Sequence, residues 1–296
     1  MKVTQLPDLQ PTGRRRKVAI GTFDGVHLGH REVIGGADTV LTFDPHPLEV
    51  LRPDKLPRLL TPFPIKRDLI AGLGADELVV IPFDHEFSQK PAEEFIQEVL
   101  IDKLGAEQVS VGENFHFGKD QGGNPELLRS HDEFETRVAP LVEVDGKPVS
   151  STRIRKLVES GDVGAAGRLL GSPFLFEGEV VEGDKRGREL GMPTANLVPD
   201  PKLVTPANGV YAAWAHGHPA AVNVGVRPTF DSDRGVLVEA YLLDFSGDLY
   251  GQTLRVAFIE RLRGEKRFDS AGDLVAQMHR DVEQAREIAS ATVPRR

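Results

Sequence analysis

The chain has 296 residues, a formal net charge of −9 and no cysteine. Its length is sufficient for two ordinary domains, and 40% hydrophobic with 27% charged residues is the composition of a soluble globular protein. The lack of cysteine excludes disulfide frameworks and thiolate chemistry, and the acidic charge argues against a general nucleic-acid binder, which needs a basic surface.

Neither a membrane span nor a signal peptide is expected. No apolar run approaches the ~20 residues that a spanning helix needs, and residues 1–17 are polar, without an apolar core. We therefore expect a cytoplasmic protein with no membrane or nucleic-acid partner; nothing in the sequence indicates oligomerisation. The basic run Arg14–Lys17 is interpreted as a solvated lead-in to the first strand, with a local anchor as the alternative.

The first half alternates short apolar runs with helix signals. Runs rich in β-branched residues predict buried strands at residues 18–20, 40–43, 78–81 and 109–111. Between them, Thr61 before Pro62, Pro91 before an apolar-periodic segment and Asn124 before Pro125 predict helix starts. This alternation predicts a Rossmann-like α/β module with a parallel sheet and a site at the carboxyl ends of the strands.

The segment Gly21–His30, read as GTFDGVHLGH, follows the first of these strands and precedes a predicted helix near Leu28. A glycine-bearing loop between strand and helix brings backbone N–H groups to a phosphate. His27 and His30 are three positions apart and would share one helix face as two donors that can carry positive charge. An incidental loop or a His-x-x-His metal pair are the alternatives, the latter disfavoured without a further ligand nearby.

Three further segments of the first half are candidate ligand contacts. The segment Thr42–Pro47 ends the second strand, where its two prolines would fix the backbone. The segment Gly112–Lys119 is not a P-loop, because its glycine spacing is one too long and Asp120 replaces the required hydroxyl, but Asn114 could still contact a ligand or metal. In Ser150–Arg155, hydroxyls and arginines either cap a helix or clamp a polyphosphate. A rigid turn is the alternative for the first two.

The second half changes character near residues 171–173. Short strands without intervening helices are predicted at residues 174–181, 210–215, 220–224, 236–243 and 254–259, which indicates a small barrel or sandwich. One terminal helix follows, with Ser270 and Asp273 as a capping box. Its apolar face is formed by Leu274, Met278, Val282 and Ala285.

Two features of the second half carry chemistry. In an extended segment Thr194 and Asn196 point to one side, and their oxygens are hard ligands suited to a magnesium ion that carries nucleotide phosphates. Glu239 interrupts a nearly continuous apolar strand. It is either an outward-facing residue on a half-exposed strand or a partly desolvated general base.

These motifs resemble, in the right order, the family of bacterial bifunctional riboflavin kinase/FAD synthetases. Gly21–His30, the Phe43–Pro47 turn, the Gly-x-Asn-Phe loop and the Ser-Ser-Thr-x-Ile-Arg segment are similar to its adenylyltransferase module. The segments 187–197, 223–230, 238–239 and 244–251 are similar to its riboflavin kinase barrel. The resemblance implies an adenylyltransferase domain over residues 1–170 and a riboflavin kinase domain over residues 171–296.

The resemblance also implies roles for individual residues. Glu239 would deprotonate the ribityl hydroxyl, and His27, His30 and Arg155 would promote adenylylation. Thr194, Asn196 and Asn114 would bind Mg²⁺. The implied ATP- and flavin-binding residues are Gly21, Phe23, Asp24, Gly29, Asp44, Pro45, Pro47, Asn114, Ser151, Thr152, Lys185, Gly187, Arg188, Pro193, Thr194 and Asn196.

The function implied is the phosphorylation of riboflavin to FMN and the adenylylation of FMN to FAD, with ATP as co-substrate. The run from His30 to the strand at Val40 is short for a crossover. This leaves open a riboflavin kinase whose adenylyltransferase module is impaired. A flavin-sensing protein without catalysis is a third reading, which the retained Glu239 disfavours.

Overall fold

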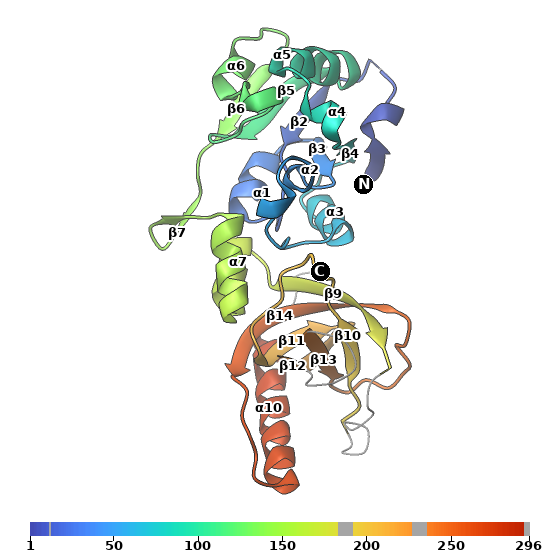
Figure 1. The fold of residues 1–296 in the computed structure, drawn as a ribbon, viewed down its shortest axis with the longest axis vertical. Helices are drawn as coiled ribbons and strands as arrows, with labels where there is room; N and C mark the ends of the chain where they lie inside the picture. The colour runs from blue at the N-terminus through green and yellow to red at the C-terminus, as the bar shows by residue number, and fades with distance from the viewer. Residues whose placement is uncertain (12, 183–191, 227–235, 293–296) are drawn as a thin grey trace. The chain divides into compact units, whose positions relative to one another are not determined.

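A computed structural model describes residues 1–11, 13–182, 192–226 and 236–292 (Figure 1). The chain divides into two compact units. The first unit comprises Met1–Pro57 and Thr61–Ser151, and the second comprises Arg58–Leu60 and Thr152–Arg296. Each unit is described by itself below.

The first unit is built on a six-stranded parallel sheet in the order β1-β4-β3-β2-β5-β6. Its strands are β1 (Lys2–Gln5), β2 (Arg16–Ile20), β3 (Thr39–Asp44), β4 (Glu77–Pro82), β5 (Ala106–Gly112) and β6 (Glu135–Ala139). The chain runs from β2 outward to β3 and β4, then crosses to β5 on the other side of β2. This reversal is the topological switch point at which α/β sheets bind ligands. The predicted Rossmann-like module is confirmed.

Helices cover both faces of this sheet. The helical segments are η1 (Leu6–Asp8), α1 (Leu28–Ile34), α2 (Pro47–Leu51), η2 (Pro53–Lys55), α3 (Phe63–Ala71), α4 (His85–Ser88), α5 (Ala92–Glu94), the π-helix η3 (Phe95–Lys103), η4 (Lys119–Gln121) and α6 (Pro125–Arg129). Residues of α1 and α3 pack with Ala19, Val40 and Val80 on one face. The helix over residues 95–103 packs with Ile20, Leu41 and Val79 on the other. Alternate strand residues thus enter two cores, as expected for a parallel sheet buried on both sides.

Of two predicted helix caps, one is confirmed and one is wrong. Asn124 caps α6 as predicted, accepting a hydrogen bond from the Leu127 N–H at 2.9 Å. The prediction that Thr61 caps the helix after it is wrong, because the N-cap residue of α3 is Pro62 and no side chain caps this helix. The Thr61 hydroxyl is instead used in a tertiary contact described below.

The crossover after His30 is short, as predicted. Helix α1 has 7 residues and ends at Gly35, whose N–H donates to the Arg31 carbonyl oxygen. Gly36 then adopts φ +82°, a left-handed conformation that favours glycine, and β3 begins at Thr39. The helix nevertheless packs into the core through Val33 and Ile34.

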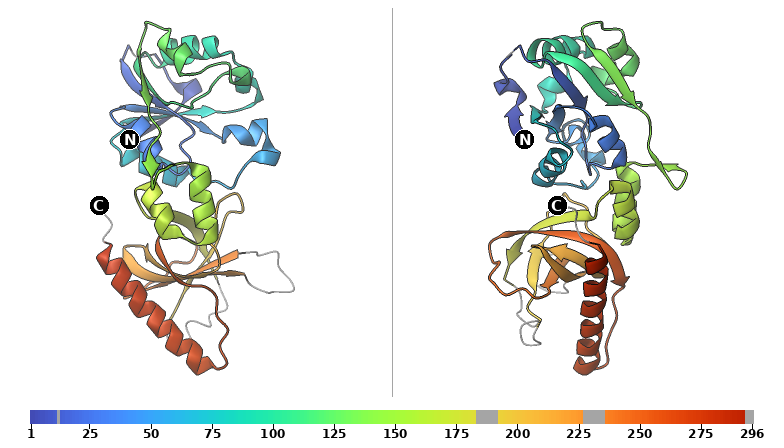
Figure 2. Two further views of the ribbon diagram at one scale, coloured as in Figure 1. Left: turned by 90° about the vertical axis from the view of Figure 1, so that its left-hand side faces the viewer. Right: turned by 180° about the vertical axis from the view of Figure 1, so that it is seen from behind.

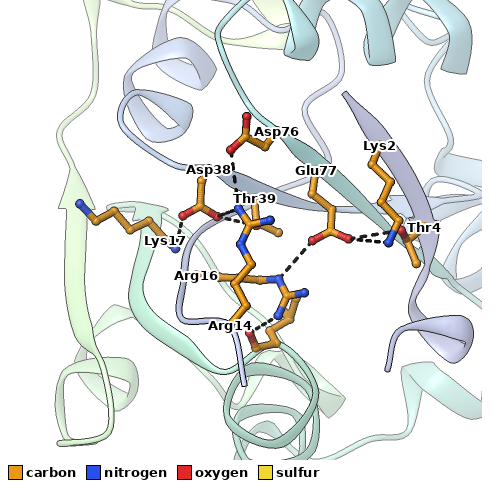
Figure 3. A network of polar contacts seen from close by, with 10 residues as sticks. Lys2, Thr4, Arg14, Arg16, Lys17, Asp38, Thr39, Asp76 and Glu77 are labelled. Carbon is orange, nitrogen blue, oxygen red and sulfur yellow. Dashed lines mark hydrogen bonds and ion pairs between the residues drawn. The ribbon is translucent and has the colours of Figure 1, made fainter. Parts of the chain in front are cut away.

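The interpretation of Arg14–Lys17 as a solvated lead-in is wrong for Arg16, which lies in β2 and is 3% exposed. Arg16 Nε donates to Glu77 Oε2 at 3.2 Å, and one of its terminal N–H groups donates to the Leu104 carbonyl oxygen at 2.8 Å. Glu77 also accepts a hydrogen bond from Thr4 at 3.3 Å (Figure 3). The buried pair therefore connects β2, β4 and the edge strand β1.

Apart from Arg58–Leu60, the second unit starts at the second residue of α7 (Ser151–Ser160) and continues with α8 (Val163–Leu170). A closed barrel follows in the order β10-β13-β12-β11-β14-β9. The barrel strands are β9 (Phe174–Val181), β10 (Ala195–Val198), β11 (Gly209–Ala215), β12 (His218–Val226), β13 (Val236–Leu242) and β14 (Thr253–Arg263). The hairpin β7 (Glu143–Val144) and β8 (Lys147–Pro148) precedes α7 in the first unit. All five strands predicted in the second half are confirmed, and the barrel alternative is the correct one.

The terminal helix α10 (Ala271–Ala291) packs against β11, β12 and β14 along the side of the barrel (Figure 2). Ser270 caps it as predicted, accepting from the Asp273 N–H at 3.1 Å. Of the predicted apolar face, Ala285 is buried and Leu274, Met278 and Val282 are half-buried. The buried Asp281 shares the Arg263 Nε–H between its two carboxylate oxygens, at 3.1 Å each, and accepts a terminal N–H of Arg263 at 2.8 Å; this pair connects α10 to β14.

The second compact unit starts before the domain boundary that we expected between residues 170 and 171. Helix α8 contacts β14 and β9, and α7 joins the second unit from Thr152 onward. Both helices lie before residue 171, so the compact second unit starts earlier than the predicted kinase domain. As a limit between two catalytic modules, the boundary at 170/171 stays a prediction.

Candidate active sites

The loop after β2 has a strained conformation. Phe23 and Val26 adopt φ values of 51° and 41°, which non-glycine residues rarely take, and Gly25 adopts 89°. Both strained side chains are buried, at 1% and 0% exposure, so packing supports the conformation. Strain of this kind tends to be concentrated at functional sites.

The two predicted histidines lie against each other in the first turn of α1. Their rings stack with centroids 3.5 Å apart, and His27 Nδ1 accepts a hydrogen bond from the His30 N–H at 3.3 Å. Because Nδ1 accepts, neutral His27 carries its proton on Nε2. Burial, and then the nearby His27 and Lys66, hold the pKa of His30 well below its ordinary value. The lowered pKa favours the neutral form of His30, so at least one of the two donors that can carry positive charge is held neutral.

A ring of hydrogen bonds fixes the loop to the start of α3. The Gly25 N–H donates to Thr61 Oγ1 at 3.1 Å, while the Thr61 N–H and hydroxyl donate to Asp24 Oδ1 at 3.2 and 3.5 Å. Ser151 Oγ donates to the Asp24 carbonyl oxygen at 2.9 Å. Asp24 is 3% exposed, so these contacts give Asp24 and Ser151 a part in holding the loop. Their contact with a ligand stays a prediction.

The neighbouring strand ends place other predicted residues at the same edge of the sheet. Asp44 ends β3 and is exposed, and the Asp44–Pro45 peptide bond is cis. Pro47 begins α2. On the other side of β2, the exposed Asn114 follows β5. Gly21, Phe23 and Gly29 belong to the loop and to α1 itself. The parallel register therefore gathers these loops around the switch point.

Lys66 was not predicted as a site residue. It lies one turn into α3, is 8% exposed, and forms no hydrogen bond or ion pair within the part of the chain that the structure describes. Its position four residues before the fully buried Ile70 is the signal that could have revealed it. A lysine in a helix is usually taken as a surface residue.

Thr152 and Arg155 belong to the second unit, on α7. Arg155 Nε donates to the Arg58 carbonyl oxygen at 2.7 Å. Both residues of this contact lie in the second unit, so the role of Arg155 beside the two histidines stays a prediction.

In the barrel, three polar side chains form a row across adjacent strands. Asn196 of β10 is paired with Glu239 of β13, which is paired with Asn223 of β12. Asn223 Nδ2 donates to Glu239 Oε2 at 3.2 Å. In the next row Leu197, Val238 and Val224 are all fully buried. Because side chains alternate along a strand, the polar row lies on the face opposite the core.

The oxygen of the Asn196 side chain is the unusual atom of this row. Asn196 is 5% exposed, and its Oδ1 atom has no hydrogen-bond partner. Its Nδ2 donates to the Thr194 carbonyl oxygen at 3.4 Å. A buried, unpaired amide oxygen costs free energy unless a ligand supplies a partner. The strand β10 that carries it was not predicted as a strand, and Asn223 was not predicted as a site residue.

Several predicted residues cannot be placed further. Lys185, Gly187 and Arg188 lie outside the described residues. Pro193 is exposed and Thr194 half-buried, just before β10.

In the described ranges no group of three or more His, Cys, Asp or Glu side chains could hold a metal ion. Within the same ranges, no helix has the length and apolar character to cross a membrane.

Two family models match the chain. One described as FAD synthetase matches residues 9–153, and one described as riboflavin kinase matches residues 170–289. A bifunctional riboflavin kinase/FMN adenylyltransferase of Pseudomonas fluorescens is 36% identical over 310 residues, covering 99% of each chain. The protein of the same name from Bacillus subtilis is 35% identical over 288 residues, covering 90% of each. The crystal structure of a macrolide-efflux protein from Streptococcus pneumoniae has a TM-score of 0.85 and 31% identity, covering 97% of this chain and 99% of that one.

Proposed function

The chain belongs to the family of bifunctional riboflavin kinase/FMN adenylyltransferases, and we propose that its two units divide the two reactions between them. The enzyme transfers the γ-phosphoryl group of ATP to riboflavin, giving FMN and ADP. It then joins FMN to the AMP moiety of a second ATP, giving FAD and pyrophosphate. Riboflavin, FMN and ATP are its small-molecule substrates. The alternative of a kinase alone is not favoured, because the FAD synthetase match spans the first unit.

The polar row in the barrel is the observation that carries the kinase assignment. Glu239 is half-buried beside Asn196 and Asn223, and it is the carboxylate of this row. We assign it as the general base that accepts the proton of the ribityl 5′-hydroxyl, while that oxygen attacks the γ-phosphorus and ADP leaves. Asn223 orients the carboxylate through its hydrogen bond.

Magnesium fits the residues beside Glu239. The unpartnered Oδ1 of Asn196 and the hydroxyl of Thr194 are neutral oxygen donors, which Mg²⁺ accepts when substrate phosphates supply the remaining ligands. Bound there, the ion would neutralise phosphate charge on ATP. Asn114 is the corresponding candidate in the first unit, where it lies exposed after β5.

In the first unit the chemistry needs no protein nucleophile. A phosphate oxygen of FMN attacks the α-phosphorus of ATP, and the bond from that phosphorus to the bridging oxygen of pyrophosphate breaks. His27, with its proton on Nε2, and neutral His30 act as hydrogen-bond donors to phosphate oxygens. Ser151 assists as a further phosphate contact. Thr152 and Arg155, which belong to the second unit, are phosphate contacts predicted from the sequence. We also propose that the enzyme works in the cytoplasm.

The division of labour is tested by changing Glu239→Gln in the full-length protein. Riboflavin phosphorylation should fall about 10²- to 10⁴-fold, the range for loss of a general base. FAD formation from supplied FMN should stay within two-fold of wild type. Glu260→Gln is the matched control, because Glu260 is an exposed glutamate on the barrel strand β14. A parallel loss of both activities in a folded Glu239 variant would contradict the assignment.

A further inference from the structure

The buried Lys66 is the group of the first unit that the chemistry described above does not use. It is one of the few charged residues of the described chain that are below one-tenth exposed. Its counterpart Arg16 is satisfied by Glu77 and by a carbonyl oxygen. Lys66 forms no hydrogen bond or ion pair to the described residues, so its ammonium group can donate to a ligand.

The surroundings of Lys66 place it at the nucleotide end of the sheet. The segment that leads into helix α3 is held to the loop after β2 through the contacts of Thr61, five residues before Lys66, with Asp24 and Gly25. Three titratable groups interact electrostatically with Lys66: Asp24 and Asp44 raise its pKa, and its charge lowers the pKa of His30. Asp44 ends β3 at the carboxyl edge of the sheet, and His30 lies in the first turn of α1. Lys66 therefore lies among elements that converge on the switch point.

An unsatisfied buried atom belongs to His30, on which the charge of Lys66 acts. His30 Nδ1 is buried and has no hydrogen-bond partner. Burial lowers the pKa of Lys66, and Asp24 and Asp44 counteract this by favouring the charged form. A buried ammonium beside an imidazole with an unused nitrogen is costly unless a ligand engages the pair. An anionic ligand compensates for this cost, and the substrate ATP supplies one.

We propose that Lys66 binds the β- and γ-phosphates of ATP during adenylylation and stabilises the departing pyrophosphate. This inference rests on the proposed adenylyltransferase function of the first unit. Negative charge accumulates on the bridging oxygen as the bond to the α-phosphorus breaks, and a fixed ammonium with few competing partners stabilises that charge strongly in a water-poor site. The two histidines then act at the α-phosphate as donors, while Lys66 provides positive charge at the β- and γ-phosphates.

The reverse reaction isolates this role. Pyrophosphate attacks the adenylyl phosphorus of FAD, forming ATP and releasing FMN, and riboflavin phosphorylation does not involve pyrophosphate. In full-length Lys66→Met protein, kcat/KM for pyrophosphate should fall about 100-fold, the range for loss of one charge-stabilising group. Lys66→Arg should recover much of this loss. Arg67→Met is the matched control, since Arg67 is the next residue on α3, is 46% exposed and pairs with Asp68; it should stay within two-fold of wild type.

Each outcome decides between ligand binding and a structural counterion. If kcat/KM for pyrophosphate in Lys66→Met stays within three-fold of wild type, the proposal is overturned. A second result would also overturn it: Lys66→Met loses hydrogen-exchange protection in β2–β5, while Lys66→Arg has the same KM for pyrophosphate as wild type. Lys66 would then act only as a structural counterion to Asp24. A wild-type enzyme that makes no FAD would contradict the proposed function itself, independently of Lys66.

Discussion

Asn223 holds the carboxylate of Glu239 through a 3.2 Å hydrogen bond between directly paired residues of β12 and β13. Since Glu239 also faces Asn196 on its other side, the carboxylate is positioned by one amide and lies next to another. This relationship explains how a glutamate can occupy a barrel strand without an ion pair in the described residues.

The first prediction follows from this contact. Changing Asn223→Ala removes the donor and leaves the Glu239 side chain free to change rotamer, so kcat for riboflavin phosphorylation should fall about 10-fold with little change in KM for ATP. FAD formation from FMN is the internal control, because it belongs to the other unit. An unchanged kcat would show that Asn223 has no part in positioning Glu239.

The second prediction concerns pH. The pKa of His30 is lowered in the native state, first by burial and then by His27 and Lys66, so the unfolded chain binds a proton on this residue that the native chain does not. The neutral native form is favoured above the unfolded pKa of about 6.5, and stability is lost as the pH falls below it. The contribution amounts to at most about 1.4 kcal/mol per pH unit.

The test compares wild type with His30→Gln. The unfolding free energy of the first unit, followed by hydrogen exchange in β2–β5, should fall more steeply in wild type as the pH drops from 6.5 to 5. In His30→Gln the unfolding free energy should depend less on pH, by an amount equivalent to the uptake of up to about one proton on unfolding. Equal slopes in the two proteins would mean that His30 titrates normally in the folded state.

The third prediction concerns the buried pair of Arg16 and Glu77. Both side chains are 4% exposed, so Arg16→Met leaves the buried Glu77 carboxylate with only the Thr4 hydroxyl and the exposed Lys2, 3.6 Å away, and should cost about 3 kcal/mol of stability. The control Arg15→Met removes a 63% exposed arginine whose carboxylate partner, Glu107, is 3.9 Å away, and should cost less than about 1 kcal/mol. Urea should abolish FAD formation at a lower concentration in Arg16→Met than in Arg15→Met.

The sequence predicted those parts of the fold whose packing produces a local pattern of apolar and turn residues. Strands β2 to β5 are apolar because both of their faces are buried, and β9 and β11 to β14 are separated by clear turn residues. The edge strands β1 and β6 were missed, since an edge strand faces solvent and needs no apolar run. The short β10 was missed as well.

The candidate sites were predicted where motifs are contiguous and missed where tertiary structure supplies the residue. His27 and His30 share one loop, whereas Lys66 reaches the same region from another helix. Thr61 was read as a helix cap because its local signal is that of a cap, yet Asp24 and Gly25, far away in the sequence, compete for its hydroxyl and backbone N–H. Local signals cannot show which of two partners a hydroxyl will take.

The last prediction tests that choice of partner. Thr61→Val removes the acceptor of the buried Gly25 N–H and should cost about 1–3 kcal/mol, with FAD formation reduced and riboflavin phosphorylation unchanged. Thr136→Val is the control, because the Thr136 hydroxyl in β6 is buried without a partner and its removal should be neutral or stabilising. Stability follows from urea denaturation of the two variants. If Thr61→Val were as stable and active as Thr136→Val, the hydrogen-bonded ring would not be what holds the loop after β2 in its strained conformation.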